Sequence, residues 1–208
     1  MKVLIGCEES QAVCIEFRKL GHEAYSCDLQ ECSGGHPEWH LQMDIFEAIK
    51  LKKWDLMIAH PPCTYISYAG TSSWNNPGRI KLRLEALEFF MRLWEAPIDR
   101  ICLENPKSCA SPVIAKYSQV IQPYYFGDRD YKTTWLWLKN LPMLIHTPET
   151  NIFYEGTHTL KPEPFSIDNT LRAHKRYFTD SKHRDSKNRS KTFPGIAKAM
   201  AEQWSNLT

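Results

Sequence analysis

A short apolar strand that ends in two prolines constrains the fold of this chain more than any other feature. Residues 54–60 (WDLMIAH) form a nearly continuous apolar run, as expected of a buried strand. Pro61 and Pro62 end it, because each proline fixes φ and removes an N–H donor. Ligands of open parallel sheets bind in the loops beyond the carboxyl ends of the strands. We therefore interpret Cys63 as a candidate nucleophile; the alternative is a small buried hydrophobe, the commonest state of cysteine.

Strand and helix patterns alternate along the chain. Strands are predicted over 2–6, 23–29, 54–60 and 100–103, with a strand or turn over 41–46 and two strands within 120–142. Helices are predicted over about 11–20, 47–52, 81–94 and 192–203. The helix over 81–94 is expected to pack through Leu84, Leu87, Phe90 and Met91, and the polar residues 70–80 form a loop long enough for a lid. This alternation predicts one α/β domain over 1–208, with a mostly parallel sheet and helices on both faces.

Composition narrows the class of protein. The chain is 42% hydrophobic and 24% charged, as in a soluble globular domain. It has no apolar run long enough to span a bilayer, and its first residues lack the pattern of a signal peptide, so we expect a cytoplasmic protein. The seven cysteines form no CxxC pair, which predicts free thiols.

A zinc site is the alternative use of the cysteines. Cys27, Cys32, His36 and His40 loosely follow a Cys2His2 pattern. The two pairs are closer than the roughly 12 residues that separate them in a usual finger, so we expect a loop without metal.

The net charge of +2 indicates no particular partner, but residues 172–191 carry eight Lys or Arg against two Asp. Such a run either neutralises nucleic-acid phosphates or is a solvated segment.

The first fifty residues predict a nucleotide-binding unit. The strand over 2–6 is followed by a turn, a helix and a second strand, in which Asp28 is placed to bind ribose hydroxyls. Gly6 is the one glycine of this turn where dinucleotide-binding proteins have three. The pattern therefore disfavours a pyrophosphate and favours an adenosine without phosphates.

Glu104 follows the next strand in order after the strand that leads to Cys63. Both side chains would then project into one crevice, although a solvent-facing carboxylate is the alternative. A carboxyl group beside a thiol suits covalent chemistry on a ring, in which the thiolate adds and the carboxyl group binds the ring nitrogen.

These motifs together resemble the DNA cytosine-5 methyltransferases. The loop P-P-C-x-x-x-S-x-A-G (61–70) is similar to the family's catalytic loop, and Glu104-Asn105-Pro106 resembles its E-N-V tripeptide. GCEES departs from the family's D-x-F-x-G-x-G, and Lys132 is the only cation near the expected place of its Q-x-R-x-R motif. The large recognition domain is essentially absent, since only the irregular, basic residues 143–191 precede a closing helix over 192–205. The chain thus resembles the compact, phage-type members of this family.

The resemblance implies a Rossmann-like class I methyltransferase fold that uses S-adenosylmethionine. It implies that Cys63 attacks carbon 6 of a cytosine flipped from duplex DNA, while Glu104 stabilises the protonated ring nitrogen. The cofactor-binding residues implied are Gly6, Cys7, Glu8, Glu9, Ser10, Asp28, Leu29, Asp44, Ile45 and Pro61. The substrate-binding residues implied are Ser67, Gly70, Asn105 and Lys132.

Two other functions stay open at this point. The chain could modify a free pyrimidine nucleotide or RNA, which would account for the missing recognition domain. It could also be a non-catalytic cofactor- or nucleic-acid-binding module, although binding alone requires neither Cys63 nor Glu104. For a DNA enzyme, a separate recognition subunit or a second copy of the chain could supply target recognition.

Overall fold

A seven-stranded sheet forms the centre of the computed structural model, which describes residues 1–146, 166–167, 175–176 and 191–207. The strand order is β3-β2-β1-β4-β5-β7-β6. The strands are β1 Lys2–Gly6, β2 Glu23–Asp28, β3 His40–Gln42, β4 Leu56–Ala59, β5 Arg100–Pro106, β6 Gln119–Ile121 and β7 Thr134–Lys139. Neighbours from β3 to β5 are parallel, whereas β7 runs antiparallel to both β5 and β6. The predicted α/β architecture with a mostly parallel sheet is confirmed, with β7 as the exception.

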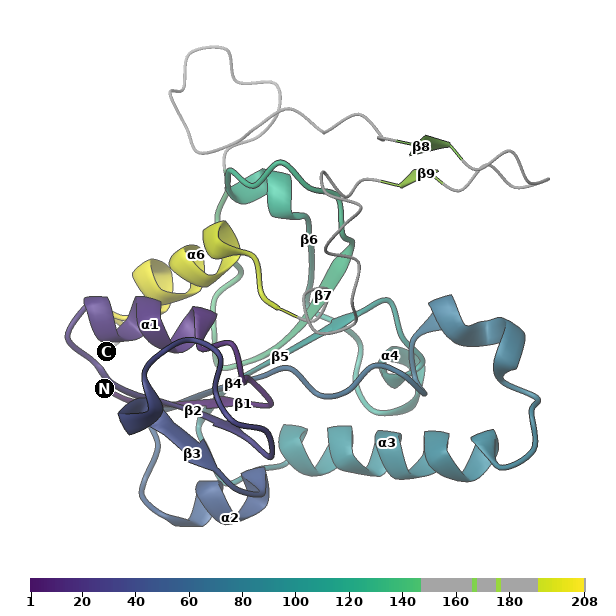
Figure 1. Cartoon of the computed structure of the whole chain (residues 1–208), viewed down its shortest axis with the longest axis horizontal. Coiled ribbons are helices and arrows are strands. Elements are labelled where there is room, and N and C mark those ends of the chain that lie inside the picture. The colour runs from purple at the N-terminus through teal and green to yellow at the C-terminus, as the bar shows by residue number, and fades with distance from the viewer. Residues whose placement is uncertain (147–165, 168–174, 177–190, 208) are drawn as a thin grey trace.

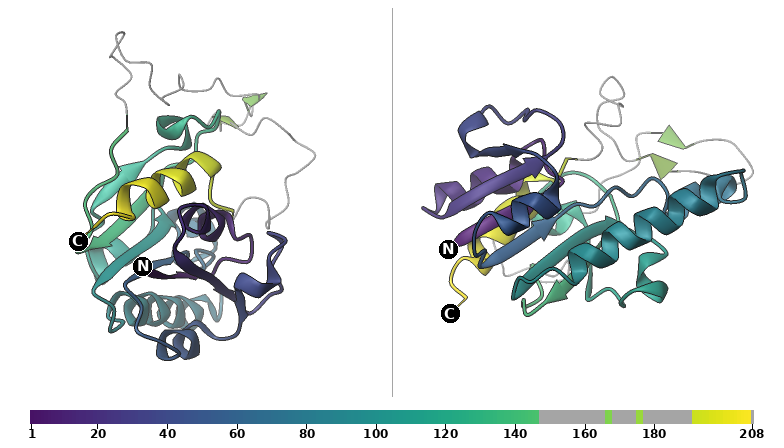
Figure 2. Two further views of the ribbon diagram at one scale, coloured as in Figure 1. Left: turned by 90° about the vertical axis from the view of Figure 1, so that its left-hand side faces the viewer. Right: turned by 90° about the horizontal axis from the view of Figure 1, so that it is seen from below.

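Helices cover both faces of the sheet (Figures 1 and 2). They are α1 Ala12–Lys19, α2 Ile45–Lys50, α3 Arg79–Trp94, α4 Ala110–Val113 and α6 Pro194–Trp204, with 3-10 turns η1 Pro37–Trp39, η2 Tyr68–Ser73 and η3 Pro123–Phe126. On one face, α1 and α6 pack over Val3 and Ile5. On the other, α2, α3 and α4 pack over Leu4 and Met57. Alternate residues of the central strands therefore face two separate cores.

The strand order reverses direction between β1 and β4, the neighbours at the centre of the sheet. The order 3-2-1-4-5 is that of doubly wound nucleotide-binding sheets, in which ligands bind beyond the carboxyl ends of the strands at this reversal. The residues at that edge include Gly6, Asp28, Ala59 and Pro106, which end β1, β2, β4 and β5. The prolines after β4 thus lie where the fold places ligand-binding loops.

The predicted packing face of α3 is partly wrong. Phe90 is buried and Leu87 half-buried, but Leu84 and Met91 are 62% and 39% exposed. Leu93 is the additional residue that packs. The amino-terminal part of α3 extends past the sheet (Figure 1), so apolar residues there have no strand to cover.

Most of the basic run lies outside the described residues. Of its members, Lys175 and Arg176 form β9 (Lys175–Arg176), which pairs with β8 (Ser166–Ile167) in an antiparallel ladder. In the described part of the chain, no helix has the length and apolar character needed to cross a membrane.

Candidate active site

The loops that follow β4 and β5 are tied together. The side-chain amide of Asn105 donates a hydrogen bond to the carbonyl of Pro61 at 2.7 Å. Ser67 and Ser108 form an isolated antiparallel bridge, and the N–H of Tyr68 bonds the carbonyl of Lys107 at 3.0 Å. These bonds therefore hold the turn that carries Cys63, after β4, against the residues that follow Glu104 in β5.

Cys63 lies in a tight turn. Its carbonyl accepts the N–H groups of Ile66 and Ser67 at 3.2 and 2.9 Å. The thiol is not in a disulfide, and the residue is half-buried between exposed Pro62 and Thr64. Downstream, the Ser67 hydroxyl accepts the N–H of Ala69 at 3.2 Å and caps η2. The predicted substrate residues Ser67 and Gly70 thus shape the loop, and their contact with substrate stays a prediction.

Glu104 is buried and paired with His60, a residue that the sequence analysis missed. Nδ1 of His60 donates to Oε2 of Glu104 at 2.8 Å, and both side chains are 9% exposed. The strand register places them together, because Ala59 pairs with Leu103 and the next residues are His60 and Glu104. The signal in the sequence was a histidine directly before the two prolines. Nε2 of His60 is buried and has no partner among the described residues.

Each member of this pair favours the charged form of the other. Burial would raise the pKa of Glu104, but the hydrogen bond from His60 and the charge of Lys132 outweigh burial and hold this pKa below its ordinary value. Burial would lower the pKa of His60, but the hydrogen bond to Glu104 and the charges of Glu104 and Glu8 raise it. The contacts of the pair therefore favour the imidazolium form of His60 and the carboxylate form of Glu104. Lys132, predicted near the substrate, lies close enough to act on both groups.

Thr192 brings the end of the chain to the same place. It is 8% exposed, and its hydroxyl oxygen lies 3.5 Å from Nδ1 of His60. Two residues later α6 begins, so the predicted closing helix approaches the site through the segment that precedes it. No local pattern singled out Thr192, because its role depends on a contact 132 residues away.

Glu8 caps the start of α1. Its carboxylate oxygens accept the N–H groups of Val13 at 2.7 Å and Cys14 at 3.3 Å. Burial raises the pKa of Glu8, although His60 and the two N–H bonds oppose this. In dinucleotide-binding folds, a pyrophosphate accepts the N–H groups at this helix end. Here the carboxylate of Glu8 accepts these hydrogen bonds instead. Such an arrangement suits a ligand without phosphates.

The other predicted cofactor residues surround the carboxyl ends of β1 and β2. Cys7 adopts a left-handed conformation (φ 57°), and burial first, then the nearby Asp28 and Asp44, raises the pKa of its thiol. Asp44 is exposed and caps α2 through the N–H of Phe46 at 2.7 Å. Ser10 is half-buried, Glu9 is buried and Leu29 is 72% exposed. Asp28 and Asp44 therefore place two carboxylates near the Cys7 thiol at the strand ends.

Three predicted cofactor residues have structural roles. Ile45 is 5% exposed, and a Cβ on Gly6 would lie 2.7 Å from its Cδ1. A larger residue in place of Gly6 would therefore displace the Ile45 side chain, apart from any effect on a ligand. Pro61 is buried and supplies the carbonyl that binds Asn105.

Replacing Asn105 with aspartate should loosen the two loops. Asn105 is 1% exposed, and the change would place a carboxylate oxygen against the Pro61 carbonyl. We expect a loss of about 1–3 kcal/mol in the free energy of unfolding, measured by urea denaturation. The exposed Asn75, changed in the same way, is the control and should leave the midpoint unchanged. Equal effects of both changes would contradict the inferred tie between the loops.

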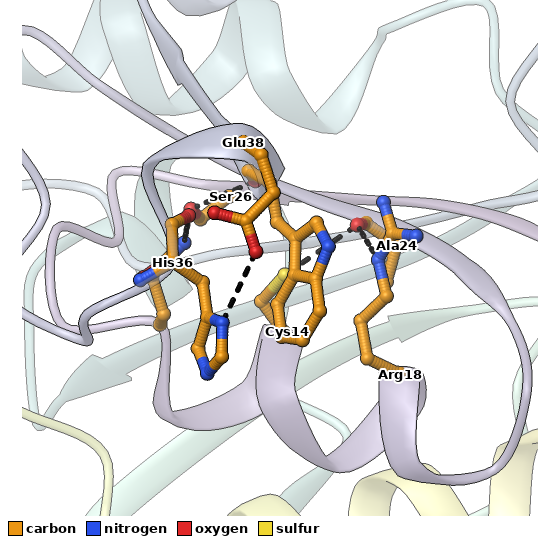
Figure 3. Close-up of polar contacts among 8 residues, drawn as sticks. Cys14, Arg18, Ala24, Ser26, His36 and Glu38 are labelled. Carbon is orange, nitrogen blue, oxygen red and sulfur yellow. Dashed lines mark hydrogen bonds and ion pairs between the residues drawn. The ribbon is translucent and has the colours of Figure 1, made fainter.

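Three of the four residues in the alternative zinc pattern have other contacts, and the fourth, Cys32, is a half-buried free thiol. His40 bonds the Ser26 hydroxyl through Nδ1 at 2.8 Å. Cys27 is buried in β2, and its thiol donates to the carbonyl of Met43 at 3.4 Å. His36 stacks on Trp39 and lies 3.2 Å from a Glu38 oxygen (Figure 3). Within the described ranges there is no group of three or more His, Cys, Asp or Glu residues that could hold a metal ion.

Comparisons with known proteins assign no family to the chain. No protein-family model matches the chain, and no curated protein matches it. Among solved structures, it is similar to a candidate DNA modification methyltransferase encoded within a prophage of E. coli, with 11% sequence identity and a TM-score of 0.44. The match covers 72% of this chain and 51% of that protein, so the chain spans about half the length of that protein. A likeness of this extent assigns neither a family nor a substrate.

Proposed function

We propose that this chain is an S-adenosylmethionine-dependent DNA cytosine-5 methyltransferase with a class I methyltransferase fold. The observation that carries the proposal is the junction of the two loops, where the turn of Cys63 is fastened to the strand exit that bears Glu104. The junction lies at the edge of the sheet where doubly wound folds bind ligands. A binding protein would need neither a cysteine in a proline-stiffened turn nor a buried histidine–glutamate pair beside it.

The strand ends suit S-adenosylmethionine better than a dinucleotide. Glu8 takes the N–H groups at the start of α1, so a pyrophosphate would meet a carboxylate there. Asp28 is half-buried at the end of β2, where it pairs with Gln42 of β3, and its Oδ1 accepts the N–H of Gln30 at 3.0 Å. A carboxylate at this strand end can also accept ribose hydroxyls. When bound, the cofactor supplies a methyl group on a sulfonium ion. We assign its site to the residues around Cys7, Asp28 and Asp44.

Cys63 and Glu104 would then divide the chemistry on the ring. The Cys63 thiolate forms a bond to carbon 6 of the cytosine, and the electron pair of the 5,6 double bond makes carbon 5 nucleophilic. Oε2 of Glu104 is bound by His60, which leaves Oε1 to accept a hydrogen bond from the protonated ring nitrogen. After carbon 5 has gained the methyl group, a base removes its proton and the carbon–sulfur bond breaks. The enzyme is thereby restored.

The test is to trap the covalent step. The protein is incubated with S-adenosylmethionine and duplex DNA containing 5-fluorocytosine, and mass spectrometry detects a protein–DNA adduct. Fluorine cannot leave as a proton does, so the adduct should accumulate, whereas matched cytosine duplex should be released methylated. An adduct with RNA or methyl incorporation into free dCMP, but neither with DNA, would overturn DNA as the substrate. Absence of cofactor binding would overturn the methyltransferase assignment altogether.

A further inference from the structure

The loop that carries Cys63 borders a groove, and the proposed chemistry does not involve this groove. Its volume is about 680 Å³, and it is lined by Tyr68, Lys107, Ser111, Pro112, Lys116 and Trp135. Tyr68 comes five residues after Cys63, and Lys107 comes three residues after Glu104. Three extended residues span at most about 11 Å, so the groove begins close to the proposed position of the target base.

The walls of the groove are aromatic, and further aromatic rings pack against them. Tyr117 stacks on Trp135 with ring centroids 4.0 Å apart, and Trp74 packs on Tyr68 at 5.5 Å. The Tyr68 N–H is bonded to the carbonyl of Lys107, which fixes the two sides of the groove to each other. Rigid aromatic surfaces at low entropic cost are typical of sites that contact bases and sugars.

The charge of the groove is positive and uncompensated. Lys107 and Lys116 are exposed, and neither forms an ion pair with any described residue. Lys107 lies 5.9 Å from the centre of the Tyr68 ring, and no carboxylate lines the groove within the described chain. The two lysines provide cations for phosphate groups, and the aromatic side chains provide a surface for the adjoining sugar and base.

We propose that this groove binds the DNA strand next to the target nucleotide, with phosphodiester groups at Lys107 and Lys116. The inference rests on the proposed function, since it places the groove by the position of Cys63 and Glu104. Successive nucleotides of a duplex strand rise by about 3.4 Å, so a groove that begins within about 11 Å would hold the strand no more than a few nucleotides from the flipped base. This contact would supply affinity in a chain without a large recognition domain.

The test compares two double variants that remove the same charge. K107Q/K116Q neutralises the groove, and K53Q/K139Q neutralises the opposite edge of the sheet, where Lys53 precedes β4 and Lys139 pairs with Ile101 at the start of β5. Affinity for a labelled duplex is measured by fluorescence anisotropy between about 50 and 200 mM salt. We expect K107Q/K116Q to weaken binding ~10-fold and to make the slope of log K against log salt shallower by about 2, because two phosphate contacts are lost.

The control variant K53Q/K139Q should bind like the parent protein. Equal weakening by both variants, or none by K107Q/K116Q, would overturn the proposed groove. If K107Q/K116Q weakened the affinity for RNA of the same sequence but not for DNA, DNA would be ruled out as the ligand of the groove. These binding results do not depend on catalysis. If methyl transfer is detected, K107Q/K116Q should raise the KM for DNA and leave kcat unchanged; if no transfer or adduct is found in any protein, the proposed function fails while the binding comparison still decides the groove.

Discussion

Cys63→Ser should lower methyl transfer into duplex DNA on the order of 10³-fold or more, because a serine hydroxyl is far less nucleophilic than a thiolate. The turn should survive the change, since the Cys63 backbone carbonyl, not the thiol, receives the N–H groups of Ile66 and Ser67. Transfer is measured with labelled S-adenosylmethionine, and cofactor binding by calorimetry. We expect cofactor affinity to be unchanged, so that the loss is assigned to the chemical step.

A second half-buried cysteine provides the matched control. Cys32 lies in the loop after β2 and is also outside any disulfide. Cys32→Ser should keep full transfer and still form the adduct with 5-fluorocytosine, whereas Cys63→Ser should form none. Transfer that survives in the Cys63 variant, or is lost equally in both, would contradict Cys63 as the nucleophile.

The sheet could be predicted from the sequence because its central strands are buried on both faces. Buried parallel strands are continuous apolar runs, and prolines or glycines end them, as Pro61 and Pro62 do after β4. The short elements could not be predicted in this way. α4 and η3 have four residues each, too few for a hydrophobic period to be visible.

The candidate site was predictable only where its residues are local in sequence. Cys63 and Glu104 stand at strand ends that the pattern marks. The role of His60 could be predicted only from the register between β4 and β5. The role of Thr192 could be predicted only from where the carboxyl-terminal segment packs. Leu84 is exposed although it shares the helical period of the buried Phe90, because the period does not encode which part of α3 packs on the sheet. Long-range contacts therefore complete a site that local sequence only outlines.

Glu104→Gln should lower methyl transfer by about 10²–10³-fold at every pH. The neutral amide keeps the size of the side chain, but it lacks the charge that would stabilise the protonated ring nitrogen. The rate is measured from pH 5 to 9 under single-turnover conditions, so that product release does not obscure the chemical step. Adduct formation with 5-fluorocytosine should slow in parallel, because the same charge stabilises the addition of Cys63.

His60→Gln separates positioning from direct action, because glutamine can still donate a hydrogen bond to Glu104 but carries no charge. The imidazolium helps to hold the pKa of Glu104 low against the effect of burial, with Lys132 as the other nearby cation and Glu8 as the nearby anion. Loss of the His60 charge should raise the pKa of Glu104, although Lys132 and the new amide donor still lower it, so the acid limb of the pH–rate profile should move to higher pH. The rate should fall most in acid and approach that of the parent protein in alkali, where Glu104 is again ionised. Glu104→Gln should show no such recovery. A loss that is equal at all pH values in His60→Gln would mean that His60 only packs against Glu104 and does not set its charge.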